Sequence, residues 1–263
     1  MLKKFHQPYY TYAHYLNQIK ELTRCEFKLR DQSTLLGFLW TLLNPLLMFL
    51  VLYLLFIKWM GNHVHLFQLY LIVGVVQWGY MTNATSCGMR SVIQKSSLVK
   101  NFIFPHEVIV LSSVLTITLI HLLELLVMMG FLLFWGANMS LKWLWLPVVV
   151  FIETMMVTGV ALFLSRWAVE YKDTDRIWSI VIQAAFFVTP VFYPETILSP
   201  GRRQIIMLNP MALLIKQTRE FMVYDRAPSL LVLGFLFALS AGILLTGYYY
   251  FKRGEPHFAE KFP

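Results

Sequence analysis

The stretch FFVTPVFYPETILSPGRRQIIMLNPMALL, residues 186–214, decides how this chain folds. It is apolar enough for a membrane protein, yet it contains Pro190, Pro194, Pro200 and, after Asn209, Pro210. Proline removes a backbone donor and clashes with the preceding helical turn, so no continuous helix can cross a bilayer here. Broken backbone at bilayer depth is tolerated only where protein or a water-filled path covers it. These five residues are therefore candidate elements of a conduit or gate.

The composition places the whole chain among integral membrane proteins. Of its 263 residues, 58% are hydrophobic and only 14% are charged. The net charge of +8 would suggest nucleic acid in a soluble domain. Here the Lys and Arg residues mostly flank apolar runs, so we interpret them as topology signals and expect no nucleic-acid partner. Cys25 and Cys87 indicate neither a disulfide framework nor a metal site.

Six apolar windows have about the 20 residues that a membrane-spanning helix needs. They are residues 35–57, 66–89, 108–137, 143–164, 177–193 and 228–251. We predict an all-α integral membrane protein with six transmembrane helices and one transmembrane domain over residues 1–263. If both termini are cytoplasmic, the basic residues on the outer side are only Lys58, Lys142, Arg202, Arg203, Lys216, Arg219 and Arg226. The positive-inside rule thus predicts cytoplasmic termini.

Two segments outside the spans have a helical pattern of their own. Residues 1–33 are predicted to hold a cytoplasmic amphipathic helix, on which Tyr12, Tyr15, Ile19, Leu22 and Leu29 share one face. It would lie on the anionic membrane surface, pack on a partner, or do both. Residues 195–224 form the long outer loop, whose halves are too short to span and too apolar to be solvated. We predict a re-entrant hairpin, the alternative being an interfacial loop without a gating role.

The loop at residues 91–105 is unusually apolar for a segment between two spans. Ser96 or Ser97 could cap a short helix that ends before Pro105. Such a helix would present apolar side chains to a soluble partner or would lie in the membrane interface.

Ionisable side chains within the spans are costly in lipid and are usually functional. His121 and Glu124 are three residues apart and share a helical face, so they could pair, with Glu153 as a further partner. We favour this structural role over proton coupling. His63 and His65 could hold a metal through alternate side chains, but an ordinary polar turn is the simpler interpretation, and we expect no metal.

The order of motifs along the chain resembles the ABC-2 type permeases of polysaccharide export. The motifs are GFLWTLLNPLL at residues 37–47, KNFIFP at 100–105, YKD at 171–173, FVTPVFYP at 187–194 and NPM at 209–211. The resemblance implies a homodimer of six-span subunits in the inner membrane of a bacterium. It also implies two separate nucleotide-binding ATPase subunits and export of a lipid-linked glycan such as O-antigen, capsule or teichoic acid.

The resemblance further implies roles for two segments. Residues 195–224 would be an outer gate, and residues 96–104 would be a coupling helix seated in the ATPase. The coupling residues would be Ser96, Ser97, Leu98, Val99, Lys100, Asn101, Phe102 and Phe104. Family members often carry Arg-Asp where this chain has Lys172-Asp173, which keeps the charge but loses the planar fork. The loop at 167–176 would make a second contact with the ATPase or the amphipathic helix, or would be a solvated turn.

The chain cannot itself be a P-loop ATPase. None of its glycines is followed by Lys, so the phosphate-cradling GxxxxGK[ST] loop is absent. We therefore expect a transport subunit without cofactors, with ATP and Mg²⁺ bound by the partner. ATP-driven closure of the partner would push on residues 96–104. The amphipathic helix would guide a lipid pyrophosphate head, with Arg24, Lys28 and Arg30 as candidate contacts.

Aromatic residues make up 16% of the chain and suit a sliding glycan, because sugars pack their C–H faces on rings. The same residue types also favour bilayer interfaces and helix contacts. The candidate conduit residues are Trp40, Phe49, Tyr53, Phe186, Phe187, Phe192 and Tyr193.

Two other function classes are weaker. An ion-coupled carrier often has paired broken helices in two inverted halves, whereas here only one half is proline-broken. A membrane-embedded glycan transferase needs clustered acids, but the outer loops offer only the widely spaced Glu195, Glu220 and Asp225.

Overall fold

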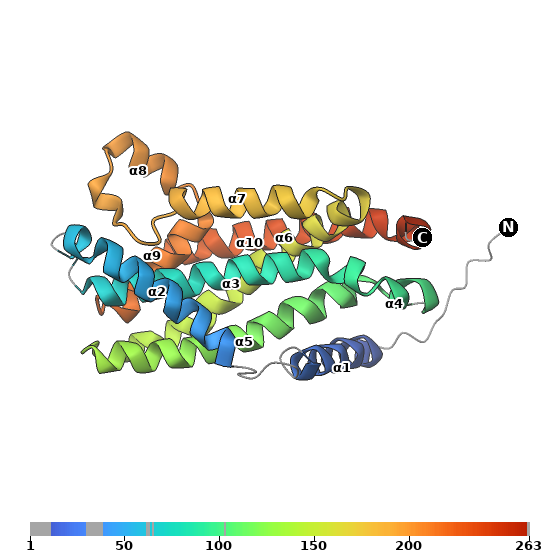
Figure 1. Cartoon of the computed structure of the whole chain (residues 1–263), viewed down its shortest axis with the longest axis horizontal. Coiled ribbons are helices and arrows are strands. Elements are labelled where there is room, and N and C mark those ends of the chain that lie inside the picture. Colours follow the sequence, from blue (N-terminus) through green and yellow to red (C-terminus); the bar gives the residue numbers. More distant parts are fainter. Residues whose placement is uncertain (1–11, 30–38, 62–63, 65, 103, 262–263) are drawn as a thin grey trace.

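The computed structural model describes residues 12–29, 39–61, 64, 66–102 and 104–261, and no strand occurs in these ranges (Figure 1). The all-α prediction is therefore confirmed for the described chain. The elements are α1 Tyr12–Leu29, α2 Leu39–Met60, α3 Phe67–Gln94, α4 Ser96–Asn101, α5 Glu107–Phe134, η1 Leu141–Trp145, α6 Leu146–Glu170, α7 Thr174–Val188, η2 Glu195–Ile197, α8 Pro200–Ile206, α9 Pro210–Met222, α10 Leu230–Gly254, η3 Glu255–His257 and α11 Phe258–Lys261.

The long helices run along one axis, and the short ones gather at its two ends (Figure 1). Helices α1, α4 and α11 lie at one end, while α8 and α9 lie at the other. Segments far apart in sequence therefore meet at the first of these ends. We call these the α4 end and the α9 end.

Helix α3 lies at the centre of the bundle and packs on α5 and α6. Its first half is buried almost without interruption, with Leu69, Leu71 and Val73 fully covered. Helix α6 in turn packs on α10, where a side chain on Gly247 would come within 2.2 Å of the Gly159 carbonyl oxygen. Small residues at this crossing allow the two backbones to touch, as is common between membrane helices.

Among the described residues, four helical segments are long and apolar enough to cross a membrane: Leu39–Trp59, Glu107–Phe134, Leu141–Glu170 and Leu230–His257. The other two predicted spans differ from these. Helix α3 has 28 residues, but its second half carries many polar side chains. Helix α7 has only 15 residues and ends at Val188, so the predicted helical span to residue 193 is wrong at its end. The cause is Pro190, because the residue before a proline is driven out of the helical region.

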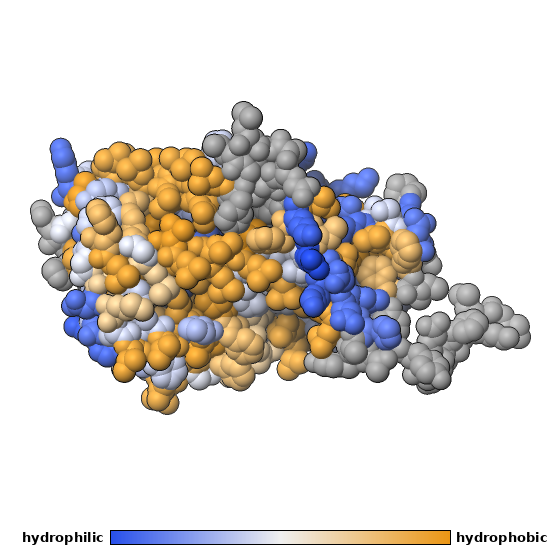
Figure 2. Space-filling model, turned by 90° about the horizontal axis from the view of Figure 1, so that it is seen from below, coloured by the Kyte–Doolittle hydropathy of each residue, from blue (hydrophilic) through white to orange (hydrophobic). Residues whose placement is uncertain are grey.

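The outer surface is that of a protein surrounded by lipid. Figure 2 shows a broad hydrophobic band on one face, with hydrophilic side chains gathered toward the two ends. Exposed leucines occur on three different helices: Leu54 is 66% exposed, Leu126 62% and Leu231 88%. A soluble monomer rarely exposes so continuous an apolar surface.

Helix α1 is amphipathic, and its packed face overlaps the predicted one, since Tyr15, Ile19 and Leu22 are at least partly covered. It lies on α5 through Ile19, Thr23 and Glu26, whereas Leu29 is 63% exposed. The predicted face was chosen by apolar character alone. The actual contact is partly polar, since the facing part of α5 carries serines and a threonine.

Candidate functional site

The proline-broken segment is folded into two unlike halves at the α9 end. In the first half, η2 and α8 contain no buried residue, whereas α9 buries most of its side chains. Pro190 and Pro194 are buried, Pro210 is partly buried at the start of α9, and Pro200 is exposed. The segment is thus a surface arm followed by a helix of the core.

Arg219 of α9 holds this end together. The residue is only 4% exposed. Its Nε donates to the Tyr70 carbonyl oxygen at 3.0 Å, Nη1 to that of Pro190 at 2.8 Å and Nη2 to that of Val191 at 2.6 Å. The guanidinium also lies 3.4 Å from the centre of the Tyr70 ring. One buried cation therefore satisfies the carbonyl groups that the proline break leaves without helical partners.

A glycine makes room for this arrangement. A side chain on Gly74 would come within 2.4 Å of Arg219 Nη2 and 2.5 Å of the Val191 carbonyl oxygen. Beside it, the Tyr70 hydroxyl donates to the Tyr193 carbonyl oxygen at 2.9 Å. The turn after α7 is thus fixed directly onto α3.

The rest of the broken segment has its own polar contacts. The Asn209 side-chain oxygen accepts from the Met211 backbone at 2.9 Å and caps α9, while its Nδ2 donates to Thr189 Oγ1 at 2.8 Å. Glu195 accepts from Arg203 of α8 at 2.8 Å and from Lys216 of α9. These contacts connect the surface arm to the core helix.

The predicted conduit aromatics fall into different environments. Phe49, Phe186 and Phe192 are buried, and Phe192 packs between Phe56 and Phe186 at ring distances of 4.8 and 5.6 Å. Tyr53 and Tyr193 are partly buried. Only Trp40, at 49%, and Phe187, at 62%, are well exposed. Within this chain alone, Trp40 and Phe187 are exposed enough to line a path, Phe49 and Phe192 are core residues, and Phe186 is only 9% exposed.

An open groove of about 360 Å³ lies between α2, α3 and α7; we call it the α2–α7 groove. Aromatic and polar side chains share its walls. Its lining is Asn44, Pro45, Met48, Val75, Trp78, Gly79, Thr82, Asn83, Glu124, Ile182, Gln183, Phe186 and Phe187. The groove brings together parts of the first and fifth predicted spans, as the aromatic pattern suggested, but its third wall is α3.

Buried ionisable groups meet partners inside the chain. His121 Nδ1 lies 3.4 Å from Glu124 Oε2, and the His121 ring stacks on Tyr80 with 4.2 Å between centres. The structure gives Glu153 a partner other than this pair. With its amide oriented to suit its neighbours, Gln77 donates to the Glu153 carboxylate and accepts from Thr218 Oγ1 at 3.1 Å.

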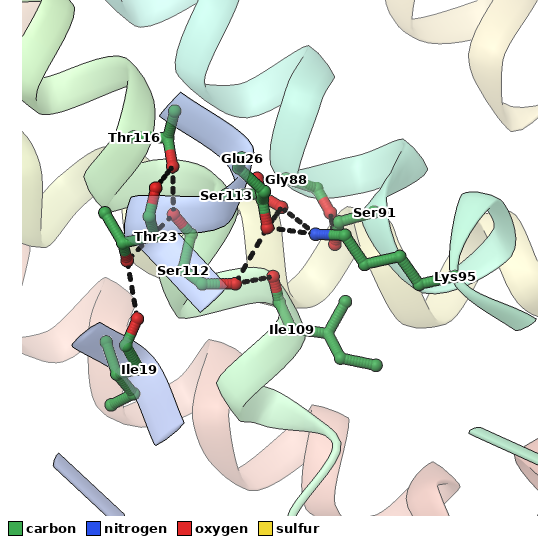
Figure 3. A network of polar contacts seen from close by, with 10 residues as sticks. All are labelled: Ile19, Thr23, Glu26, Gly88, Ser91, Lys95, Ile109, Ser112, Ser113 and Thr116. Carbon is green, nitrogen blue, oxygen red and sulfur yellow. Dashed lines mark hydrogen bonds and ion pairs between the residues drawn. The ribbon is translucent and has the colours of Figure 1, made fainter. Parts of the chain in front are cut away.

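At the α4 end, a polar network joins α1 to α5 and to the start of α4 (Figure 3). Glu26 of α1 pairs with Lys95 and accepts from Ser112 Oγ at 3.0 Å and Ser113 Oγ at 3.2 Å. Lys95 also donates to Ser113 at 3.0 Å. Since Lys95 directly precedes α4, the position of α1 is coupled to that of α4.

Helix α4 occupies the predicted position between α3 and α5, but its side chains divide into two groups. Val99 is buried in the chain's own core, and Phe104 is partly buried in the same cluster. Phe102 is 60% exposed. Ser97, Lys100 and Asn101 are also exposed, while Ser96 and Leu98 are partly covered. Val99 is therefore unavailable to a partner, which corrects its predicted place in the contact.

The C-terminal segment supports α4 from the other side. Phe258 of α11 is buried in the cluster that contains Val99. Glu255 accepts from the His106 backbone at 2.7 Å and from Lys252 at 2.7 Å. Burial lowers the pKa of His106, against the opposing attraction of Glu255 and Glu107 and together with the repulsion of Lys252.

The remaining predicted contacts lie on the surface or outside the described residues. Arg24 and Lys28 are exposed on α1. Arg30, His63 and His65 lie outside the described residues. In the 167–176 loop Lys172 is exposed, and the strong contact is made by Asp175, which pairs with Arg90 of α3 at 2.6 Å.

A comparison with known proteins decides the family. A model described as ABC-2 type transporter matches residues 17–223, from α1 to the end of α9. The chain belongs to the ABC-2 type transporter family. The resemblance inferred from the motifs is thereby confirmed.

Several curated proteins resemble this ABC-2 type transporter over most of their length. Two are named O-antigen export system permease protein RfbA, from Klebsiella pneumoniae. One is 27% identical over 257 residues, covering 95% of this chain and 97% of the relative. The other is 28% identical over 212 residues, covering 80% and 82%. A protein of the same name from Myxococcus xanthus is 29% identical over 248 residues, covering 94% and 95%.

Sequence reasoning about this ABC-2 type transporter missed two residues that organise its ends. Arg219 was counted as an outer-loop cation, although it shares a helical face with Ile215 and Met222. Glu26 follows Ile19 and Thr23 at helical spacing. In both cases a charge on the apolar face of a short helix was the available signal.

Proposed function

We propose that this chain is the membrane permease subunit of an ATP-driven exporter that moves a lipid-linked polysaccharide of the O-antigen type across the inner membrane. The observation that carries the proposal is the similarity to O-antigen export permeases along nearly the whole length of both chains. The apolar helices support a multi-pass position in the membrane. The ion-coupled carrier and the glycan transferase are not favoured by these relatives.

In the working assembly, two copies of this chain would pair with two ATPase subunits that bind ATP and Mg²⁺. Helices α3 and α7 would complete a set of six spans with α2, α5, α6 and α10, so that both termini are cytoplasmic. The distribution of basic residues supports this orientation. The α4 end would then face the cytoplasm, and the α9 end would face outward.

Within this assembly, residues 91–105 would receive the push of the ATPase through the exposed side of α4. Lys95 would pass it to α1 through Glu26, because the two side chains are paired. Arg24, Lys28 and Arg30 would hold the pyrophosphate of the lipid carrier. Residues 195–224 would form a re-entrant outer gate above the aromatic residues Phe187 and Tyr193. The candidate gate residues are Pro190, Pro194, Pro200, Asn209 and Pro210.

Co-purification tests the partner and the contact together. The tagged chain is purified from its own cells, and ATPase activity is measured for the wild type, Phe102→Asp and the control Leu141→Asp. Phe102 and Leu141 are both well exposed, at 60% and 86%, but Phe102 follows α4, whereas Leu141 begins η1, which packs on α9. We expect an ATPase to co-purify with the wild type and Leu141→Asp and to be lost from Phe102→Asp.

Removal of the chain tests the substrate. Cells without it are expected to retain the polymer inside and to lose it from the surface, with export restored by the wild type. Recovery of no ATPase, or unchanged surface polymer, would show that the proposed function is wrong.

A further inference from the structure

One side of α3 carries a run of polar side chains and one glycine. Gly79, Asn83, Ser86 and Arg90 follow at spacings of four, three and four residues, so they share one helical face, with Thr82 beside them. We call these five residues the polar edge of α3. It starts in the middle of the bundle and runs to the α4 end.

The polar edge joins two hollows. The α2–α7 groove contains Gly79, Thr82 and Asn83. A second cavity of about 450 Å³, the α1–α5 cavity, is lined by Glu26, Leu29, Asn83, Ser86, Cys87, Arg90, Gln94, Lys95, Ser113, Thr116 and Ile117. Asn83 lines both, so the hollows meet at this residue. From Val75 to Gln94 the α3 wall is about 28 Å long at about 1.5 Å per residue, close to the thickness of a bilayer core.

The amide and hydroxyl side chains of the polar edge make no hydrogen bond to the described residues. The Thr82 hydroxyl oxygen is buried without a hydrogen bond to the described residues. Asn83 and Ser86 of the polar edge, and Asn44 and Gln183 opposite, likewise make no hydrogen bond within the described part. Thr118, Thr154 and Thr158 on other helices behave differently, since each donates to a carbonyl one turn earlier.

Unpaired amides at this depth point to a ligand that forms hydrogen bonds. Lipid tails would leave each group unsatisfied at considerable cost. Trp78, Phe186 and Phe187 line the same groove. A sugar chain matches both features, because it presents apolar C–H faces to rings and hydroxyl groups to amides.

The glycine in the wall strengthens this assignment. A side chain on Gly79 would meet nothing within 4 Å, so the packing of this chain does not require glycine there. Because Gly79 has no side chain, the groove stays wide at this position. The wall stops at Val75, directly beside Gly74, where Arg219 fixes the turn after α7.

We propose that the polar edge of α3 is the wall along which the carbohydrate part of the substrate passes. The sugar chain enters from the α1–α5 cavity, crosses Asn83 and stops below the turn held by Arg219. This deepens the proposed function, on which it rests, by naming a path on α3 where the aromatic pattern indicated only the first and fifth spans.

Thiol labelling tests whether water reaches the polar edge and whether the polymer covers it. Asn83→Cys and the lipid-facing control Leu126→Cys are each made in a chain carrying Cys25→Ser and Cys87→Ala. A charged, membrane-impermeant methanethiosulfonate is applied to membranes from cells that make the polymer and from cells in which its synthesis is blocked. We expect Asn83→Cys to react at least about tenfold faster than Leu126→Cys, because the reactive thiolate forms in water and not in lipid. We also expect the reaction to slow when polymer is made.

A substitution that fills the groove tests whether export needs this path. Gly79→Leu fills the groove without a clash inside the chain, and Gly242→Leu on α10 is the control, since its site is equally open. We expect Gly79→Leu to lower surface polymer about tenfold at equal amounts of chain and ATPase in the membrane, and Gly242→Leu to leave it unchanged.

The opposite results would overturn the proposal. A second copy of the chain covering the wall would give an Asn83→Cys disulfide dimer on oxidation and no protection by polymer. Normal export by Gly79→Leu would place the sugar elsewhere. If export needs this chain but the labelling rate of Asn83→Cys is the same with and without polymer synthesis, the proposed path along α3 is wrong and the proposed function stands. If the polymer reaches the surface without this chain, the proposed function itself fails.

Discussion

Arg219 and Asn83 are both strongly polar side chains in the apolar part of the molecule, but their surroundings are opposite. Arg219 is buried and donates to three carbonyl groups of its own chain. Asn83 is exposed and makes no hydrogen bond to the described residues. The difference indicates that the first belongs to the structure and the second to the function. Substitutions at the two sites should therefore change different measurements.

Arg219→Leu is the strongest test of the structural side. It leaves the carbonyl groups of Pro190 and Val191 without the guanidinium donors, and each buried unsatisfied group costs about 1–3 kcal/mol. We expect a large fall in the thermal unfolding midpoint of the purified chain in detergent. Arg219→Lys should fall almost as far, since an ammonium on a flexible stem cannot reproduce the planar fork.

A small effect of Arg219→Leu on the unfolding midpoint would contradict the structural role of Arg219. The control is Arg226→Leu. The Arg226 side chain is 73% exposed, and its Nη1 lies 3.8 Å from Glu220 Oε2. Its midpoint should remain close to that of the wild type, because exposed ion pairs contribute about 0–1 kcal/mol.

The pair Glu26 and Lys95 is the next test, and it concerns the α4 end. Glu26→Gln and Lys95→Met each remove one member of a mostly buried pair, so each should destabilise the docking of α1 on α5. The double substitution should cost less than the sum of the two, with a coupling of about 1 kcal/mol. Protease cleavage within α1 measures its docking. Strict additivity would show that the pair does not connect α1 to α4.

The sequence predicted many of the helices but few of the side-chain contacts between them. The last span was predicted at residues 228–251, and α10 lies at Leu230–Gly254, because a long apolar run determines both. The polar edge of α3 was missed since a window average over residues 66–89 mixes it with the many apolar side chains that α3 buries. The burial of Val99 depends on Phe258 from the far end of the chain, which no local pattern contains.

A smaller effect is expected from pH at the α4 end. Burial lowers the pKa of His106, so the folded state disfavours the imidazolium, and the unfolded chain binds the proton first. This contribution to stability is present above about pH 6.5, the ordinary value, and is lost as the pH falls from there toward the lowered pKa. His106→Gln should flatten the dependence of the unfolding midpoint between about pH 7.5 and 5.5. An unchanged slope would assign the pH dependence to other groups.

The smallest change in stability is expected at Asn83, the site that we compare with Arg219. Asn83→Leu removes no hydrogen bond within the described chain, so the unfolding midpoint in detergent should stay close to the wild-type value, within about 0.5 kcal/mol. Surface polymer should nevertheless fall about fivefold, as expected for losing a hydrogen bond of about 1 kcal/mol to the passing sugar. Asn83→Gln keeps the amide and should restore most of the export. A destabilised Asn83→Leu chain would instead mean that Asn83, like Arg219, is bound within the protein, and the distinction between the two sites would be lost.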